Sequence, residues 1–341
     1  MNVLITFDYE LFLGDITGSV DECLIKPTEE LIKIAQRNNV IFNFFIDSCY
    51  LLRILNLKNK FPELESDYNK IINQLSTLIQ LGHTIELHIH PQWYKSEYLG
   101  NGEWSFDYSF YKITDFNDIE ISKIISENVF FIKENFGINP NAYRAGGWSY
   151  EPFKKISEVL LNNDIKIDST VLPNASYSSY FQRYNFINCP RKTFWRFENN
   201  PIVEDKNGRF IEIPISKYHN NFLRKIIMIF LMKIKKRSET DIFGNGKTIT
   251  SSQNTQNKRI EKLKKLFTTD ISYVSLDGIS SIFISSIYKK YLKIYGENSF
   301  FVILGHPKSL SNFSLKRLEK FIFNDREANF ISYDYISKLL R

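Results

Sequence analysis

Short apolar runs rich in β-branched and aromatic residues recur along the chain, separated by segments of helical periodicity. The runs are VLITFDYE (3–10), IFNFFID (41–47), TIELHIH (84–90), NAYRAGG (141–147), IKIDSTV (165–171), RFIEIPIS (209–216), FFVILGH (300–306) and NFISYDY (329–335). Apolar residues three or four positions apart predict helices at 28–37, 121–136 and 153–161. Nearly continuous apolar strands that alternate with helices are typical of a parallel sheet. Seven or eight such units predict an α/β fold, a closed (β/α) barrel of seven to eight strands.

Polar and titratable residues stand where several of these strands end. They are Asp8 and Glu10 at the first run, His88 and His90 at the third, Arg144 at the fourth, Asp168 at the fifth and His306 at the seventh. In a parallel barrel, the C-terminal ends of the strands form the catalytic face. Five strand ends that carry such residues predict one convergent site.

The two histidines of the third run are one residue apart. His88 and His90 therefore point to the same side of their strand, about 6–7 Å apart along the chain, and Pro91 ends the strand behind them. Asp8 and Glu10 have the same spacing. Two neutral imidazoles and one carboxylate, with a position left for water, form an open catalytic metal site. The alternative is a set of hydrogen-bonded polar groups at the barrel rim, and the paired spacing at two strand ends favours the metal.

Two further residues are open to structural explanations. His83 lies at the start of its strand, away from the predicted site, and is expected to be structural. Arg144 would be costly to bury without a carboxylate partner. A structural salt bridge and a role in the site are compatible for this arginine.

Five motifs in this order, TFDYE, GHTIELHIHPQW, RAGGWS, IDST and ILGHPK, resemble the polysaccharide deacetylase family. This is the NodB homology domain of carbohydrate esterase family 4, and the motifs look most like its divergent branch associated with surface-polysaccharide and lipopolysaccharide biosynthesis. The resemblance covers about residues 1–216 and 270–341. It implies a single catalytic barrel over 1–341, distorted in shape and interrupted by an insertion at about 217–269. It also implies a metal-dependent hydrolase that removes an N-acetyl or O-acetyl group from a sugar.

The resemblance assigns catalytic roles by motif. Asp8 matches the catalytic base, and Arg144 matches the arginine that holds it. His306 matches the general acid, and Asp168 matches the acid that orients this histidine. His88 matches the first metal-binding histidine.

Two metal-binding positions depart from the family pattern. Tyr9 stands where the family has a metal-binding aspartate, so the role is assigned to Glu10. Gln92 stands where the family has its second histidine, so that role is assigned to His90. The implied cofactor is a divalent metal held by Glu10, His88 and His90. Zinc is the first choice, with Co, Mn, Ni and Fe as alternatives.

Four residues near these motifs are predicted to contact the substrate: Tyr9, Trp93, Gly146 and Trp148. Backbone N–H groups near Tyr9 could hold the oxyanion of an acyl-transfer reaction. Trp93 opens an aromatic segment over residues 93–111. These rings could stack on sugar faces or form a hydrophobic cover over the barrel mouth, and the sequence leaves both open.

The charge is unevenly distributed along the chain. The net charge is +6, but residues 217–267 contain 13 Lys and Arg against 3 Asp and Glu, so the remainder is mildly acidic at −4. A nucleic-acid-binding protein would more often be basic across its main fold. Residues 221–237 alternate cations with large apolar residues and predict a basic amphipathic helix. Such a helix could lie on an anionic membrane close to a lipid-linked glycan, or pack on the barrel with a solvated basic face.

Composition favours a cytoplasmic protein, and the membrane-bound alternative for this helix would add peripheral contact at the inner face of the membrane. The three cysteines are odd in number and widely spaced, which fits reduced thiols better than a disulfide framework. The N-terminus shows no secretion signal. The longest apolar run, IIMIFLM, is much shorter than the roughly 20 residues of a membrane span.

Three other functions share parts of this pattern. A hydrolase of another amide, such as a formamide or a cyclic imide, would use the same groups. A glycan-binding barrel that has lost catalysis would explain Tyr9 and Gln92. An iron oxygenase can share the two-histidine, one-carboxylate ligand set, but the order of the strand-end residues fits it poorly.

Overall fold

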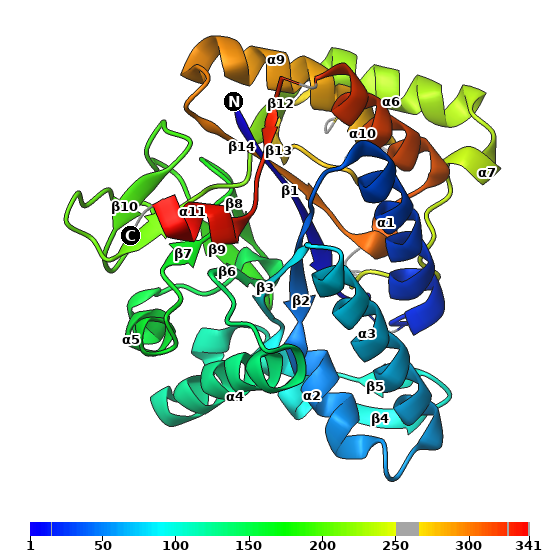
Figure 1. Cartoon of the computed structure of the whole chain (residues 1–341), viewed down its shortest axis with the longest axis vertical. Coiled ribbons are helices and arrows are strands. Elements are labelled where there is room, and N and C mark those ends of the chain that lie inside the picture. Colours follow the sequence, from blue (N-terminus) through cyan, green and yellow to red (C-terminus); the bar gives the residue numbers. More distant parts are fainter. Residues whose placement is uncertain (15, 250–265, 326, 340–341) are drawn as a thin grey trace.

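The computed structural model describes residues 1–14, 16–249, 266–325 and 327–339. At its centre is a nine-stranded sheet that curls into a distorted (β/α) barrel, with helices around it (Figure 1). The predicted fold class is therefore confirmed. No helix among the described residues is long and apolar enough to cross a membrane.

Eight strands of the sheet follow one path from edge to edge. In this order they are β10 (Trp195–Phe197), β11 (Phe210–Glu212), β7 (Ile167–Asp168), β6 (Ala142–Ala145), β3 (Thr84–Ile89), β2 (Asn43–Asp47), β1 (Asn2–Tyr9) and β14 (Phe300–Gly305). Neighbours along the path pair in parallel, except β10 with β11. The C-terminal ends of the parallel strands therefore meet at one end of the barrel.

Irregular backbone, rather than a regular strand, closes the barrel between β11 and β14. The N–H of Ser216 donates to the carbonyl of Val302 at 3.2 Å, and that of Leu276 donates to Leu304 at 2.9 Å. Ser275 forms an isolated parallel bridge with Leu304. The two segments that hold Ser216 and Ser275 thus take the place of one strand, which accounts for the distortion.

The helices around the sheet are α1 (Lys26–Asn38), α2 (Ser48–Leu57), α3 (Pro62–Gln80), α4 (Asp118–Phe136), α5 (Lys154–Asn162), α9 (Ile284–Tyr295), α10 (Asn312–Asn324) and α11 (Tyr333–Leu339). Three of them, α1, α4 and α5, are the helices that the periodicity predicts. Helix α4 shows why its sequence folds this way. Asn117 caps its first turn by accepting from the N–H of Glu120, and Gly137 ends it in the left-handed conformation at φ 68°.

The last predicted strand is wrong over most of its length. Of residues 329–335, only the two residues of β15 (Asn329–Phe330) form a strand, which pairs with β1, and α11 begins three residues later. Ser332 accepts the backbone N–H of Tyr335 and so starts the helix. The buried ring of Tyr333 then packs against the Phe45 ring, with centres 5.3 Å apart, and its hydroxyl lies 2.7 Å from Ser169 Oγ.

Shorter elements outside the main sheet surround the barrel. Three pairs of strands are β4 (Glu97–Gly100) with β5 (Glu103–Ser105), β8 (Ser176–Ser178) with β9 (Arg183–Asn185), and β12 (Lys217–Asn220) with β13 (Asp270–Tyr273). The short helices are η1 (Asp21–Ile25), η2 (Pro91–Lys95), η3 (Tyr108–Phe110), η4 (Ile113–Asp115), η5 (Gly146–Trp148), η7 (Gly278–Phe283), η8 (Pro307–Ser309) and α7 (Arg237–Thr240). Between β12 and α7 lies α6 (Phe222–Ile234). Of the predicted insertion at about 217–269, residues 250–265 lie outside the described part of the chain.

Candidate active site

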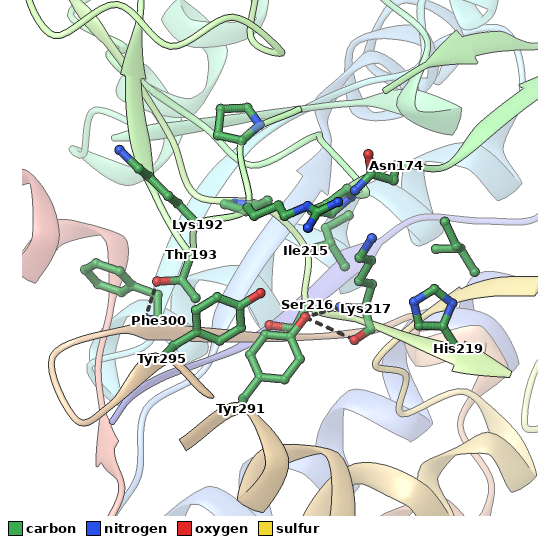
Figure 2. Close-up of a pocket in the computed structure, with 15 residues that line it drawn as sticks. Asn174, Lys192, Thr193, Ile215, Ser216, Lys217, His219, Tyr291, Tyr295 and Phe300 are labelled. Carbon is green, nitrogen blue, oxygen red and sulfur yellow. Dashed lines mark hydrogen bonds between the residues drawn. The ribbon is translucent and has the colours of Figure 1, made fainter. Parts of the chain in front are cut away.

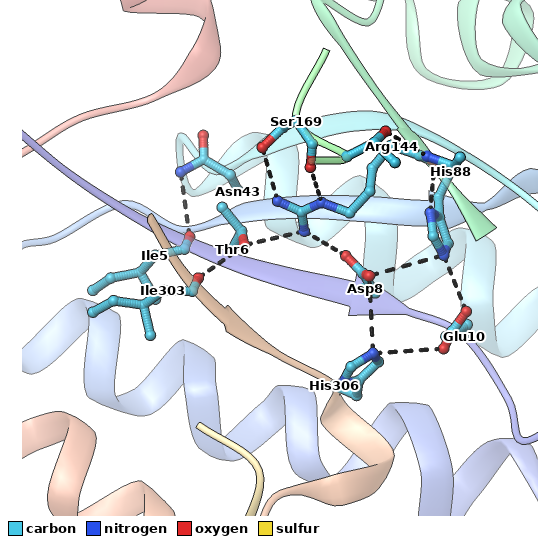
Figure 3. Close-up of polar contacts among 12 residues, drawn as sticks. Ile5, Thr6, Asp8, Glu10, Asn43, His88, Arg144, Ser169, Ile303 and His306 are labelled. Atoms are coloured by element: carbon cyan, nitrogen blue, oxygen red, sulfur yellow. Dashed lines mark hydrogen bonds and ion pairs between the residues drawn. The ribbon is translucent and has the colours of Figure 1, made fainter. Parts of the chain in front are cut away.

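The strand ends bring most of the predicted site residues together at the C-terminal end of the barrel (Figure 3). Asp8 lies on β1 and Glu10 directly follows that strand. His88 lies on β3. His306 is the first residue after β14, and Arg144 lies on β6. The alternation of side chains along each strand aims these groups into one space.

The three predicted metal ligands form a compact group. Ligand atoms of Glu10, His88 and His90 all lie within 4.8 Å of one another, and all three side chains are buried. Glu10 Oε2 is 3.0 Å from His88 Nε2 and also contacts His90 Nε2. Two imidazoles and a carboxylate are the ligand set of many catalytic zinc sites. The predicted grouping of these residues is present.

Hydrogen bonding fits a cation at this group. His88 Nδ1 lies 2.8 Å from the carbonyl of Arg144, which can only accept, so Nδ1 carries a proton. In the neutral ring, the Nε2 lone pair of His88 then faces the Glu10 carboxylate, and two acceptors in contact need a proton or a metal between them. His90 Nε2 is also buried and makes no hydrogen bond of ordinary geometry with any described residue. The donors present therefore suit a divalent metal.

Gln92 supports His90 rather than binding in its place. The Gln92 amide lies 3.3 Å from His90 Nδ1. The atom that faces Nδ1 is the amide nitrogen, and the amide oxygen is buried with no hydrogen-bond partner among the described residues. A half-turn of the amide would let this oxygen accept the Nδ1 proton and would leave Nε2 of His90 as the ligand atom. Gly146 backs the same ring, because a Cβ at this position would lie 2.6 Å from His90 Nδ1. The missing histidine of the family pattern is thus replaced by a residue that orients its neighbour.

Arg144 holds Asp8 by a buried ion pair. Its Nη1 is 2.6 Å from Asp8 Oδ1 and its side chain is fully buried. The remaining N–H groups donate to Ser169 O, Ser169 Oγ and Thr6 Oγ1 at 2.8–3.1 Å. The guanidinium also lies over the Phe45 ring, 3.9 Å from its centre. The second oxygen of Asp8 is left facing the site, 3.8 Å from His306 Nε2.

The residue that orients His306 is Asp277, so the prediction that Asp168 has this position is wrong. Asp277 Oδ2 lies 2.9 Å from His306 Nδ1, and its other oxygen accepts the backbone N–H of His306 at 2.8 Å. Burial lowers the pKa of His306, but the carboxylates of Asp277, Asp8 and Glu10 outweigh it and raise the pKa to about 9. The stretch VSLDG, a short apolar run that ends in an acid before glycine, carried the signal for Asp277.

Asp168 has a structural setting. It ends β7 and accepts from the hydroxyls of Tyr150 at 2.9 Å and Thr170 at 2.5 Å. Burial raises the pKa of Asp168, and burial together with the Asp168 carboxylate raises the pKa of the adjacent Glu212. Two buried carboxyl groups in contact hold one proton between them more easily than two charges.

Among the four predicted substrate contacts, the buried ring of Trp93 contradicts its prediction, and the side chain of Tyr9 is turned away from the site, while the role of the backbone N–H groups near Tyr9 stays a prediction. Tyr9 points out of the barrel because it lies between Asp8 and Glu10 in the strand alternation, and its hydroxyl donates to Gln74. Trp93 is fully buried and its indole N–H donates to Asp47 at 2.7 Å. Trp93 therefore belongs to the hydrophobic cover that was one of its two interpretations.

The site opens into a cavity of about 290 Å³. Its walls are Asp8, Glu10, Phe12, Leu13, His88, His90, Tyr111, Gly147, Trp148, Tyr177, Phe181, Gln182, Thr248, Ile249, Tyr273, His306 and Lys308. Trp148 thus lines this cavity, and its contact with a substrate stays a prediction. The ring of Tyr111 meets that of Phe181 with centres 5.2 Å apart, so several ring faces border the cavity.

Lys308 is a wall residue that the sequence reasoning missed. Its Nζ lies 2.8 Å from Glu10 Oε1 and donates to the carbonyl of Leu11 at 2.6 Å. Burial would raise the pKa of Glu10, but Lys308 and His90 hold it well below its usual range. Glu10 is therefore ionised, with one oxygen on the lysine and the other on the two histidines.

Comparison with known proteins gives structural neighbours only. No protein-family model and no curated protein sequence matches the chain. Among solved structures, a Mycobacterium smegmatis protein described as a polysaccharide deacetylase has a TM-score of 0.49 and 13% identity, covering 99% of this chain and 88% of that one. The allantoinase PuuE has a TM-score of 0.46 and 12% identity, covering 99% of this chain and 89% of that one. A Pseudomonas aeruginosa PAO1 protein described as a polysaccharide deacetylase gives 0.45 and 13%, covering 99% and 89%. This chain is therefore similar, at low sequence identity, to these three solved structures, two of which are described as polysaccharide deacetylases.

Proposed function

We propose that this protein is a metal-dependent carbohydrate deacetylase, which hydrolyses an N-acetyl or O-acetyl group of a sugar used in bacterial surface-polysaccharide or lipopolysaccharide biosynthesis. The observation that carries the proposal is the geometry around Glu10. Two histidines, a carboxylate held by an arginine and a histidine held by a carboxylate all face one cavity at the C-terminal end of the barrel. These are the parts that hydrolysis of an amide or ester requires.

Glu10, His88 and His90 would hold the metal, with zinc as the first choice for two nitrogen ligands and one oxygen ligand. When bound, a divalent ion polarises the acyl carbonyl and lowers the pKa of water beside it. Lys308 neutralises the second oxygen of Glu10 and fixes the direction of the carboxylate. Gln92 and the carbonyl of Arg144 fix the two rings.

Asp8 is the proposed general base. Arg144 occupies one oxygen of this carboxylate, so only the other can take a proton from the attacking water. That oxygen faces the space between His88 and His306, 3.9 Å and 3.8 Å from their Nε2 atoms. The arginine holds this carboxylate in position.

His306 is the proposed general acid. Asp277 accepts from Nδ1, so the Nε2 proton points to the cavity. His306 gives this proton to the sugar nitrogen or oxygen as the bond to the acetyl carbon breaks. Acetate leaves, and the sugar retains a free amine or hydroxyl. Tyr273 donates to Asp277 at 3.0 Å and so helps to hold Asp277 in place beside the histidine.

Acetate release from acetylated sugars tests the function. Purified protein loaded with zinc should release acetate from an N-acetylated oligosaccharide, and His306→Ala should lose roughly 10²–10⁴ of the rate. Metal analysis should find about one divalent ion per chain. Release of formate from a formamide with no acetate release would identify the other amide hydrolase. A metal-free protein that binds glycans and releases no acid would identify the inactive barrel.

We also propose that α6 holds the enzyme at the anionic inner face of the membrane, near a lipid-linked glycan. The apolar side of this helix faces outward: Leu223 is 64% exposed, Phe230 58% and Ile234 57%. Lys225 on its other side is buried and pairs with Asp270, which fixes the helix in this rotation. Lys233 stands within the apolar face, and residues 235–237 add three cations at its end.

Charge and apolar exposure together fit an anionic lipid surface. The basic segment contrasts with the mildly acidic remainder of the chain. Each cation near such a surface contributes about 1 kcal/mol, and the exposed rings and aliphatic side chains can enter the interface.

Vesicle co-sedimentation tests the membrane contact. Wild type should sediment with vesicles that contain anionic lipid and should be released by high salt. Changing Lys233, Lys235, Lys236 and Arg237 to Gln, or Leu223 and Phe230 to Ser, should leave the protein in the supernatant. Neutral vesicles are the control. If wild type also stays in the supernatant with anionic vesicles at low salt, the membrane role is wrong.

A further inference from the structure

A second cavity, of about 390 Å³, lies beside β12 and the start of β14 (Figure 2). Its walls are Pro173, Asn174, Pro190, Arg191, Lys192, Thr193, Pro214, Ile215, Ser216, Lys217, His219, Ile271, Tyr291, Tyr295 and Phe300. It shares no wall residue with the active-site cavity. No motif used above accounts for it.

The cavity is positively charged. Arg191, Lys192, Lys217 and His219 line it, whereas none of the described wall residues is an Asp or Glu. Lys192 is already paired with Glu204 at 2.6 Å. Arg191 and Lys217 have no carboxylate partner among residues 1–14, 16–249, 266–325 and 327–339. Burial lowers the pKa of Lys217, and the charge of Arg191 lowers it to a lesser degree. An anion between the two cations would offset both the cost of burying the lysine charge and the repulsion between the cations.

Aromatic rings form the other wall. Tyr291 and Tyr295 lie with ring centres 5.2 Å apart. The Tyr291 hydroxyl accepts the backbone N–H of Lys217 at 2.8 Å and donates to its carbonyl at 3.0 Å, which fixes the base of the lysine (Figure 2). Phe300 also lines the cavity. A cavity with cations on one side and ring faces on the other suits an anionic group attached to an apolar or flat body.

The second cavity is joined to the active site through one pair of strands. Lys217 on β12 pairs with Tyr273 on β13, and opposite residues of an antiparallel pair lie about 5 Å apart. Lys217 lines the charged cavity and Tyr273 lines the active-site cavity. Asn174 lines the second cavity and Tyr177, three residues later, lines the active-site cavity, so the two cavities have neighbouring walls.

We propose that this cavity binds the phosphate group of a phosphate-linked sugar whose acetyl group lies in the active site. The proposal rests on the deacetylase function and narrows its substrate to a sugar on a phosphate or diphosphate. A guanidinium and an ammonium on one anion are the usual donors to phosphate oxygens. The phosphate can belong to a nucleotide or to a lipid carrier, because both present the same anion.

Calorimetric titration with inorganic pyrophosphate tests the site without any need for turnover. Wild type should bind, and Arg191→Gln and Lys217→Gln should each weaken binding about tenfold or more. Lys192→Gln is the matched control, because Glu204 already holds this lysine. This variant should lose less than about threefold of the affinity for pyrophosphate. Equal losses in all three variants, or no binding by wild type, would overturn the proposal. Thermal unfolding should confirm that the variants fold.

The metal site could also attract pyrophosphate, so His90→Ala provides a second control. This variant should keep pyrophosphate binding, which the two glutamine variants lose. Loss in His90→Ala with retention in Arg191→Gln would assign the anion to the metal and overturn the proposal. Binding of pyrophosphate without acetate release from any sugar would leave this site standing while the deacetylase function fails.

The source of the phosphate follows from two further ligands. Uridine diphosphate that binds more tightly than pyrophosphate would support a nucleotide-linked sugar. Farnesyl diphosphate that binds more tightly would support a lipid-linked one. In either case, the increase in affinity over pyrophosphate should depend on Arg191 and Lys217. An increase that persists in Lys217→Gln and Arg191→Gln would contradict binding at this cavity.

Discussion

The two cavities handle positive charge in opposite ways. In the active site, each buried cation meets a carboxylate: Arg144 with Asp8 at 2.6 Å, His306 with Asp277 at 2.9 Å and Lys308 with Glu10 at 2.8 Å. In the second cavity, Arg191 and Lys217 line the wall, and within the part of the chain that the structure describes no wall residue carries a carboxylate. Paired charges are held in one orientation before the substrate arrives, as catalysis requires. Unpaired charges at a partly open wall keep their attraction for a ligand.

The largest expected effect falls on the base of the active site. Asp8→Asn should lower the turnover rate by a factor of roughly 10²–10⁴, because the amide cannot take a proton from water. Metal content should be unchanged, since Arg144 and not the metal group holds this side chain. Glu10→Gln should instead lose the metal. Element analysis of both variants decides between them, and the reverse result would exchange the two roles.

The next prediction compares the two arginines. Arg144→Ala leaves Asp8 buried without its partner and should lower the free energy of unfolding by about 3–5 kcal/mol. Arg191→Ala, at an exposed wall with no partner to lose, should change it by less than about 0.5 kcal/mol. Urea denaturation of both variants measures the difference. Equal losses would mean that Arg191 has a structural role.

A third prediction separates two buried aspartates. Asp277→Asn should lower turnover roughly 10²-fold, because the amide no longer stabilises the charged form of His306. Asp168→Asn should leave turnover nearly unchanged, because Asp168 bonds to Tyr150 and Thr170 instead. Steady-state rates with one acetylated sugar compare the two. A greater loss in Asp168→Asn would restore the role that the motif resemblance gave it.

The smallest expected effect concerns a histidine outside both cavities. His83 Nδ1 accepts the backbone N–H of Phe42 at 3.0 Å, and burial lowers the pKa of His83 to about 4. The unfolded chain takes up this proton near pH 6.5 while the folded chain does not, so stability falls as the pH drops from 6.5 towards 4. At pH 5 the loss is about 2 kcal/mol relative to pH 7.

His83→Asn keeps an acceptor for Phe42 but cannot titrate. Urea midpoints of wild type and this variant at pH 7 and pH 5 isolate the contribution of the histidine. The wild type should lose more stability than the variant across this interval. An equal loss in both proteins would show that His83 does not titrate in the way its burial predicts.

Much of the site could be predicted because it depends on local spacing. The pairs at positions 8 and 10 and at 88 and 90 obey the two-residue period of a strand, so their convergence follows once the strands are parallel. The same period also argued against Tyr9, whose intermediate position turns it away from Asp8 and Glu10. Trp93 was ambiguous in the sequence because a buried tryptophan and a stacking one have the same local pattern.

What the sequence by itself determined was the parallel barrel, its strand ends and the grouping of Glu10, His88 and His90, because hydrophobic period and strand spacing are properties of neighbouring residues. Only the tertiary structure decided which aspartate meets His306, which lysine meets Glu10 and where Arg191 and Lys217 lie. Asp277 reaches His306 because residues 274–276 bond to β14 across the closure of the barrel. That contact depends on how distant segments close the sheet, and no spacing along the chain encodes it.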